Sequence, residues 1–175
     1  MIRRLLLVSP HFPPVNAPDH QRVRALLPYL AELGWEAEVL CVDAAQVEGP
    51  QDELLAQTLP AGLRVHRCGA IPLRLARALR CGQIGYRAYF HLRAAGDRLL
   101  RTGRFDLVFF STAIFETLVL GPHWKRRSAI MRVCREERSS TAATRQAVKM
   151  AAHTLQLERI NTWLLSSSTR RDRTE

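Results

Sequence analysis

The chain has 175 residues, 47% of them hydrophobic, and its 26 basic against 16 acidic residues give a formal net charge of +10. This length fits a single domain with a core of ordinary size, and the hydrophobic content excludes wholesale disorder. No apolar run approaches the roughly 20 residues that a membrane-spanning helix requires. The four cysteines are widely spaced and form no paired metal motif, which predicts reduced thiols in a cytoplasmic protein.

The first predicted element is a buried strand over Leu5–Val8, because a short continuous apolar run is typical of a parallel strand covered on both faces. The proline-rich loop that follows can continue neither strand nor helix. Asn16 and Asp19 then predict a helix start, in which Asn16 accepts a first-turn N–H and Asp19 complements the helix dipole. Strand, loop and helix start indicate the first unit of a doubly wound α/β domain, where ligands bind at the turn.

Strands and helices alternate along the rest of the chain. The helix after Asn16 carries an apolar stripe to residue 33, with an expected kink at Pro28 and an end at Gly34. The further expected elements are a strand over 35–42, a short helix over 51–59, a strand over 63–68, one or two helices over 72–102 with the break at Gly82 and Gly85, a strand over 105–111, a helix over 113–126 interrupted near Gly121-Pro122, and a strand over 129–134. This alternation predicts a Rossmann-like, doubly wound parallel sheet.

The proline-rich loop contains the tripeptide Phe12-Pro13-Pro14, and Arg22 follows near the start of the predicted helix. Together with the strand before them, these residues resemble the opening of a family 4 glycosyltransferase. The later strand, which ends in Ser111 and Thr112, resembles the strand of that family that reaches the substrate cleft. The resemblance spans about Ile2 to Arg127 and implies the N-terminal half of a GT-B fold.

A GT-B enzyme has two Rossmann-like domains, and its N-terminal domain takes the acceptor while the C-terminal domain holds the nucleotide-sugar. The resemblance therefore implies the acceptor-binding half of an enzyme that transfers a sugar to a hydroxyl of a sugar or lipid-linked acceptor. Most family members retain the anomeric configuration and need no metal. No cofactor is expected, and the nucleotide-sugar donor belongs only to a full-length enzyme. Because the donor domain's paired glutamates are missing from this sequence, we expect the chain alone to be an inactive fragment.

One departure from the family concerns the first loop. The common Gly-Gly pair is replaced by Asn16-Ala17-Pro18-Asp19. Glycine lets a backbone approach a phosphate closely, and an aspartate at the helix start would repel one. We therefore expect this loop to bind acceptor hydroxyls. The candidate substrate-binding residues are those of the first loop and helix start and those at the end of the later strand: His11, Asn16, Asp19, Arg22, Ser111 and Thr112.

Each of these residues also has a structural interpretation, and no catalytic residue is assigned. His11 could serve as a base or touch an acceptor, but a single loop histidine is more often incidental. Arg22 could bind a carboxylate or phosphate, or pair with Asp19 three residues earlier on the helix surface. Ser111 and Thr112 could bind substrate or merely cap the helix that follows.

The resemblance ends after Arg127. We expect a Rossmann-like domain over residues 1–134 and a divergent helical extension with a frayed tail over 135–175. The acidic and aromatic stretch that the family carries at this point is replaced by Arg135-Glu136-Glu137-Arg138. This replacement indicates a truncated or frame-disrupted product.

Positive charge is concentrated between Arg64 and Arg104, where ten arginines stand against a single acid, Asp97. Such a run is most often a solvated face. Because aromatic and apolar residues are interleaved with it, the section could instead rest on an anionic membrane surface, peripherally at the inner membrane face. Nucleic acid is the least favoured partner, since no recognised motif accompanies the charge. The alternative function is therefore a non-catalytic basic Rossmann-like module that binds a membrane surface or an acidic partner.

Overall fold

The computed structural model describes residues 2–78, 81–127 and 132–136. Of the extension expected over 135–175, residues 137–175 lie outside the described part, as does the helix predicted within it. The proposed division at residue 134 therefore stays a prediction.

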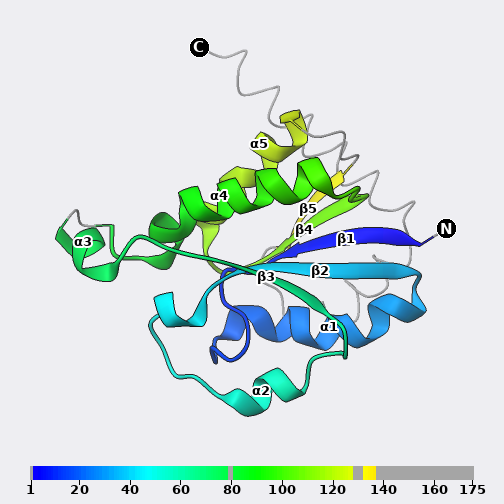
Figure 1. Cartoon of the computed structure of the whole chain (residues 1–175), viewed down its shortest axis with the longest axis horizontal. Helices are drawn as coiled ribbons and strands as arrows, with labels where there is room; N and C mark the ends of the chain where they lie inside the picture. Colours follow the sequence, from blue (N-terminus) through cyan, green and yellow to red (C-terminus); the bar gives the residue numbers. More distant parts are fainter. Residues whose placement is uncertain (1, 79–80, 128–131, 137–175) are drawn as a thin grey trace. The chain divides into compact units, whose positions relative to one another are not determined.

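The described residues form one sheet of five parallel strands in the order β3-β2-β1-β4-β5 (Figure 1). The strands are β1 Arg3–Val8, β2 Trp35–Val42, β3 Arg64–Cys68, β4 Leu107–Ser111 and β5 Arg132–Glu136. The chain builds outward from β1 to β2 and β3 on one side, then crosses to β4 and β5 on the other. This order confirms the predicted Rossmann-like fold and places its topological switch point between β1 and β4.

Helices cover both faces of the sheet. Helix α1, Gln21–Glu32, lies on one face, and α4, Ile84–Thr102, lies on the other together with α5, Leu120–Arg127 (Figure 1). Two short helices, α2 Glu53–Gln57 and α3 Leu73–Ala78, and three 3₁₀ turns at Pro18–His20, Ala44–Gln46 and Phe115–Val119 complete the connections.

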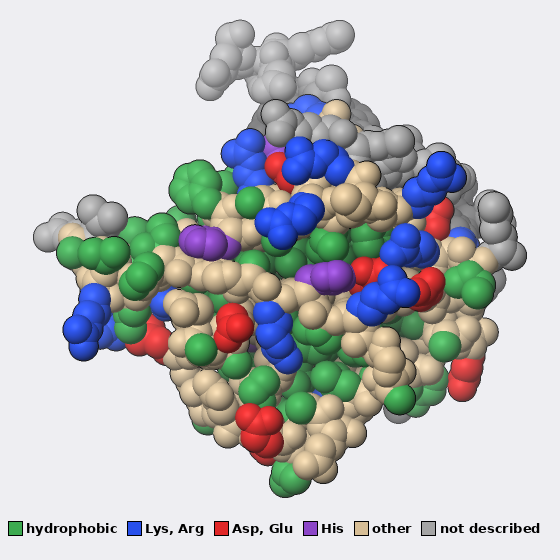
Figure 2. Space-filling model, viewed as in Figure 1, with side chains coloured by type: hydrophobic (Ala, Val, Ile, Leu, Met, Phe, Trp, Pro, Cys, Tyr) green, Lys and Arg blue, Asp and Glu red, His purple; other side chains and the backbone are tan. Residues whose placement is uncertain are grey.

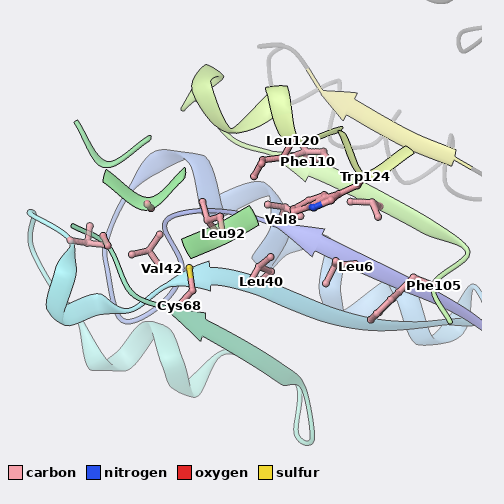
Figure 3. Packing of buried hydrophobic residues seen from close by; sticks show 14 of the residues in the cluster. Leu6, Val8, Leu40, Val42, Cys68, Leu92, Phe105, Phe110, Leu120 and Trp124 are labelled. Atoms are coloured by element: carbon pink, nitrogen blue, oxygen red, sulfur yellow. The ribbon is translucent and has the colours of Figure 1, made fainter. Parts of the chain in front are cut away.

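The core beneath α4 and α5 is formed by alternate residues of the strands, since successive side chains point to opposite faces. Leu6 and Val8 of β1 belong to the same buried cluster as Leu92 of α4 and Trp124 of α5 (Figure 3). The close approach of the two helices requires Gly96, because a Cβ at that position would lie 2.1 Å from the Trp124 ring.

Several predicted boundaries need correction. The helix expected from Asn16 begins at Gln21, after the 3₁₀ turn at Pro18–His20, and Asn16 does not cap it. Helix α1 continues past Pro28 to Glu32, and the chain leaves it at Gly34 as predicted, where the backbone has a left-handed φ of 76°. The break expected at Gly121-Pro122 falls earlier, between the 3₁₀ turn and α5, because proline in a helix's first turn removes no intrahelical hydrogen bond.

Candidate functional site

The loops after β1 and β4 leave the same edge of the sheet. Val8, the last residue of β1, is paired in parallel with Phe110 of β4, so both chains emerge side by side at the carboxyl ends of their strands. The two loops therefore share one edge of the sheet. It is the usual ligand-binding edge of an open α/β sheet.

A histidine–aspartate pair occupies the loop after β1. The Nδ1 of His11 lies 3.0 Å from both carboxylate oxygens of Asp19, whose side chain is 3% exposed. A carboxylate only accepts hydrogen bonds, so Nδ1 carries a proton in this contact, and the neutral ring with this tautomer has its lone pair on Nε2. The His11 side chain is 20% exposed. The pair therefore combines a buried carboxylate with an imidazole that reaches the surface.

The fold holds this loop in place at several points. The Ser9 hydroxyl donates a 2.8 Å hydrogen bond to the His11 carbonyl, and Arg67 of β3 donates one of 3.2 Å to the Pro13 carbonyl. Phe12 is fully buried and makes an edge contact with the buried His20 ring. His11 therefore belongs to an anchored segment. Because that segment is already ordered, substrate binding would cost less conformational entropy.

His20 has a structural part at the helix start. Its Nε2 accepts the N–H of Ala17, the residue before the 3₁₀ turn, at 3.2 Å, while the N-cap position of α1 has no side-chain cap. Burial lowers the pKa of His20 below 6.5, although the neighbouring Asp19 charge opposes that shift. The neutral ring is the form that can accept this hydrogen bond.

The other predicted residues differ in burial and in the contacts that they make. Asn16 is exposed and its backbone N–H donates to the Pro50 carbonyl at 2.8 Å, while Arg22 is half-buried on α1. Ser111 is buried at the end of β4, and its hydroxyl has no hydrogen-bond partner in the described chain. The Thr112 hydroxyl accepts the Ile114 N–H at 2.8 Å within the loop, while the 3₁₀ turn that follows has no side-chain cap at its N-cap residue. Substrate binding by these residues stays a prediction.

A hollow of about 360 Å³ opens at the same edge, between the start of α4 and the segment after β4. It is lined by Gln83, Ile84, Gly85, Ala113, Ile114, Phe115 and Glu116. Only Gly85 points to this hollow in the sequence, and this glycine lies inside α4 instead of breaking the helix as expected.

The arginine-rich section does not form one continuous surface. Arg87 is 3% exposed and donates to the carbonyls of Ile71 and Gln46, and Arg77 pairs with Glu48 at 2.9 Å. Figure 2 shows Lys and Arg side chains spread over the viewed face rather than gathered in a single patch. Part of the charge seen in the sequence is therefore used in internal contacts.

A second buried carboxylate lies on β2, away from this edge. Glu38 accepts hydrogen bonds from Arg4, from Arg64 at 3.2 Å and from His66 at 2.7 Å, and these residues come from the flanking strands β1 and β3. Burial raises the pKa of Glu38, but the hydrogen bonds from His66 and Arg4 outweigh burial and bring the pKa below 4.5. These contacts tie three neighbouring strands together.

Among the residues described, no three His, Cys, Asp or Glu side chains are grouped so as to hold a metal ion. None of the helices in the described ranges combines the length and the apolar character needed to cross a bilayer.

The sheet order and the helices on both faces define a Rossmann-like domain. No protein-family model and no curated protein sequence matches the chain. Among solved structures it is similar to UGT2 of Phytolacca americana, complexed with UDP-2-fluoro-glucose and pterostilbene. The TM-score is 0.50 and the identity 14%, over 77% of this chain and 30% of that one. The likeness shows a glycosyltransferase-like fold, and the chain spans under a third of the length of that structure.

Proposed function

We propose that this chain is the acceptor-binding domain of a GT-B glycosyltransferase of the family 4 kind. The shared fold and the Phe12-Pro13-Pro14 loop support the class of protein. The observation that carries the proposal is the His11–Asp19 pair, which stands where β1 ends, at the switch point of the sheet.

In this proposal His11 is the base for the acceptor hydroxyl. The acceptor oxygen bonds to the anomeric carbon on the face from which the nucleotide's diphosphate departs with the electron pair of the broken bond, as retention of configuration requires. Nε2 takes the hydroxyl proton. Asp19 holds the imidazole through Nδ1 and stabilises the imidazolium that results. Asp19 is therefore a positioning residue, and His11 is the group that touches the acceptor.

Transfer also requires a donor held against the acceptor, since positioning supplies a large share of the rate. In a GT-B enzyme this is the task of the second domain, so the chain alone binds acceptor without turning it over. The first test is a mass-detected assay with a panel of nucleotide-sugars and sugar or lipid-linked acceptors. Turnover above that of Asp19→Ala would contradict the inactivity.

Acceptor binding itself is tested by titrating the same acceptors into the isolated chain. Loss of one hydrogen bond to an acceptor hydroxyl corresponds to about a fivefold weaker affinity in His11→Ala. The control is His66→Ala, which removes a histidine partner of the other buried carboxylate. Equal losses in both variants, or no binding of any acceptor, would count against the proposal.

A second candidate function, docking on an anionic membrane at its inner face, is favoured by the outer face of α4. Tyr86 and Phe90 are 53% and 65% exposed, and Arg98 and Arg101 are exposed further along the same face. The acid of this helix, Asp97, lies 3.2 Å from His123 and is largely covered. Exposed aromatic rings followed by cations match the interface and headgroups of an anionic bilayer.

This candidate is tested by sedimentation with vesicles of phosphatidylcholine alone or with about 30% phosphatidylserine, which approximates the anionic lipid content of a cytoplasmic leaflet. Binding should require the anionic lipid, fall with added salt, and weaken when Phe90→Ser or Arg98→Gln is introduced. Binding that ignores both lipid charge and salt would exclude it. The matched control is Leu54→Ser, which removes an exposed apolar side chain from α2 instead.

A further inference from the structure

We propose that the hollow between the start of α4 and the segment after β4 is a binding site for a small apolar molecule that carries a hydrogen-bond donor, a hydroxyl or an amine. Its acceptor in the protein is the Glu116 carboxylate. The site is defined by its own walls, so it does not depend on the transferase reaction proposed above.

The walls of this hollow are mainly apolar. Ile84, from the first turn of α4, faces Ile114 and Phe115 from the segment after β4. Phe115 is 48% exposed, so an aromatic ring is available to a ligand at the rim. The volume of about 360 Å³ lies at the lower end of the range for small-molecule pockets, and apolar walls with a few polar groups are their usual composition.

Glu116 supplies the polar group. Its side chain is half-buried, and no described residue donates a hydrogen bond to it. The carboxylate lies at the amino end of α4, where the helix dipole favours a negative charge. A carboxylate offers several acceptor positions and no donor, so it selects ligands with a hydroxyl or amine. It also repels anions, which the end of a helix would otherwise attract.

Gly85 shapes the floor of the hollow. A Cβ added to Gly85 would lie 2.6 Å from a Glu116 carboxylate oxygen and 2.6 Å from a methyl group of Ile114, closer than real contacts allow. Any larger residue there must displace the carboxylate and fill the space. Gly82, three residues earlier, is a matched comparison, because its added Cβ would meet nothing nearer than 3.5 Å.

The experiment titrates the full chain with three probes of one shape, phenethyl alcohol, phenethylamine and phenylacetate, and follows binding by NMR. The alcohol and the amine should bind at least tenfold more tightly than phenylacetate. Gly85→Ala should weaken both by at least tenfold, and Gly82→Ala should leave them unchanged. Comparable binding of all three probes, or full affinity in a folded Gly85→Ala, would overturn the proposal.

A second variant keeps the test decisive if Gly85→Ala fails to fold. Glu116→Gln leaves the shape of the hollow and removes its charge, so phenethylamine should bind about tenfold more weakly and phenylacetate more tightly than in the parent chain. An unchanged order and ratio of affinities in Glu116→Gln would show that Glu116 does not select the ligand, and the proposal would fail. Because no nucleotide-sugar is present, neither result bears on transfer.

Discussion

Two buried carboxylates, Asp19 and Glu38, each face a histidine but sit in different parts of the sheet. Asp19 lies in the loop at the carboxyl edge and holds His11 at 3.0 Å, while Glu38 lies within β2 and holds His66 at 2.7 Å. Glu38 is also joined to arginines of both neighbouring strands, so its charge is matched inside the sheet. The same residue types thus form a structural network within the strands and a candidate reactive pair at their ends.

The two histidines differ in their exposure and in the partners of the carboxylate that each one contacts. The ring hydrogen bonds of His11 in the described chain use Nδ1, and its side chain is partly exposed at the edge where ligands bind. His66 lies beside Arg64 on an edge strand and donates to a carboxylate that already has guanidinium partners. Chemistry is therefore expected from the pair in the loop and stability from the pair in the sheet.

The largest expected effect is on stability, at the sheet. Glu38→Gln should lower the free energy of unfolding by about 2 kcal/mol, because it leaves Arg4 partly buried without its charge partner. Urea unfolding measures this change. Glu36→Gln is the control, since that exposed residue pairs with Arg64 at 3.5 Å and should cost under about 0.5 kcal/mol. Equal losses in the two variants would contradict a structural role for Glu38.

The next effect is a pH dependence located at the loop. Burial lowers the pKa of His20, so the unfolded chain binds a proton more readily than the folded one. Stability from this residue is complete above pH 6.5 and is lost as the pH falls through the lower folded pKa. His20→Gln should flatten the unfolding free energy against pH just below 6.5. A dependence that persists unchanged there would assign it to other groups.

Glu38 adds a second acid-side dependence at lower pH. Its folded pKa lies below 4.5, so its stabilisation is present above pH 4.5 and is lost as the pH falls through the folded value. Glu38→Gln should remove the loss of unfolding free energy that occurs below pH 4.5 and leave the loss just below pH 6.5, which is assigned to His20, unchanged. Urea unfolding at a series of pH values separates the two, and a variant that alters both together would break the assignment.

The smallest expected effect on stability is at the loop pair. Asp19→Asn keeps the shape of the side chain and should lower the unfolding free energy by about 1 kcal/mol, less than the change at Glu38. The substitution should also change which nitrogen of the His11 ring carries the proton, because an amide can hold the ring in either tautomer. The ¹⁵N shifts of the ring report the tautomer directly. A stability loss as large as that of Glu38→Gln would remove the contrast between the regions.

The sequence predicted the strands and the order of the elements, because apolar runs and helical stripes depend on local spacing. It misplaced the start of α1, because a 3₁₀ turn over Pro18–His20 precedes that helix and Asp19 turns to His11. The pairing of His11 with Asp19 depends on a loop fixed from outside by Arg67 and by the Asn16–Pro50 hydrogen bond. Contacts of that range leave no periodic pattern in a sequence.

The hollow at α4 and the burial of an arginine also depend on contacts between residues far apart in the chain, so the sequence pattern did not predict them. Glycine is typical of a helix break, so Gly85 predicts one from the sequence. In the fold it lies inside the helix, because Glu116 and Ile114 leave no room there for a Cβ. Arg87 counts as surface charge in the sequence, but two carbonyls from distant segments accept its hydrogen bonds in the fold. Charge composition alone cannot separate a buried guanidinium from an exposed one.

The most direct test of the account is a titration of acceptors into the chain with ¹⁵N-labelled histidine, with His11→Gln and His66→Gln used to assign the ring signals. The account predicts that His11 is protonated at Nδ1 and that an acceptor hydroxyl shifts its Nε2 signal while the His66 signals stay in place. A His11 ring protonated at Nε2, or a response confined to His66, would contradict a reactive pair at the end of β1.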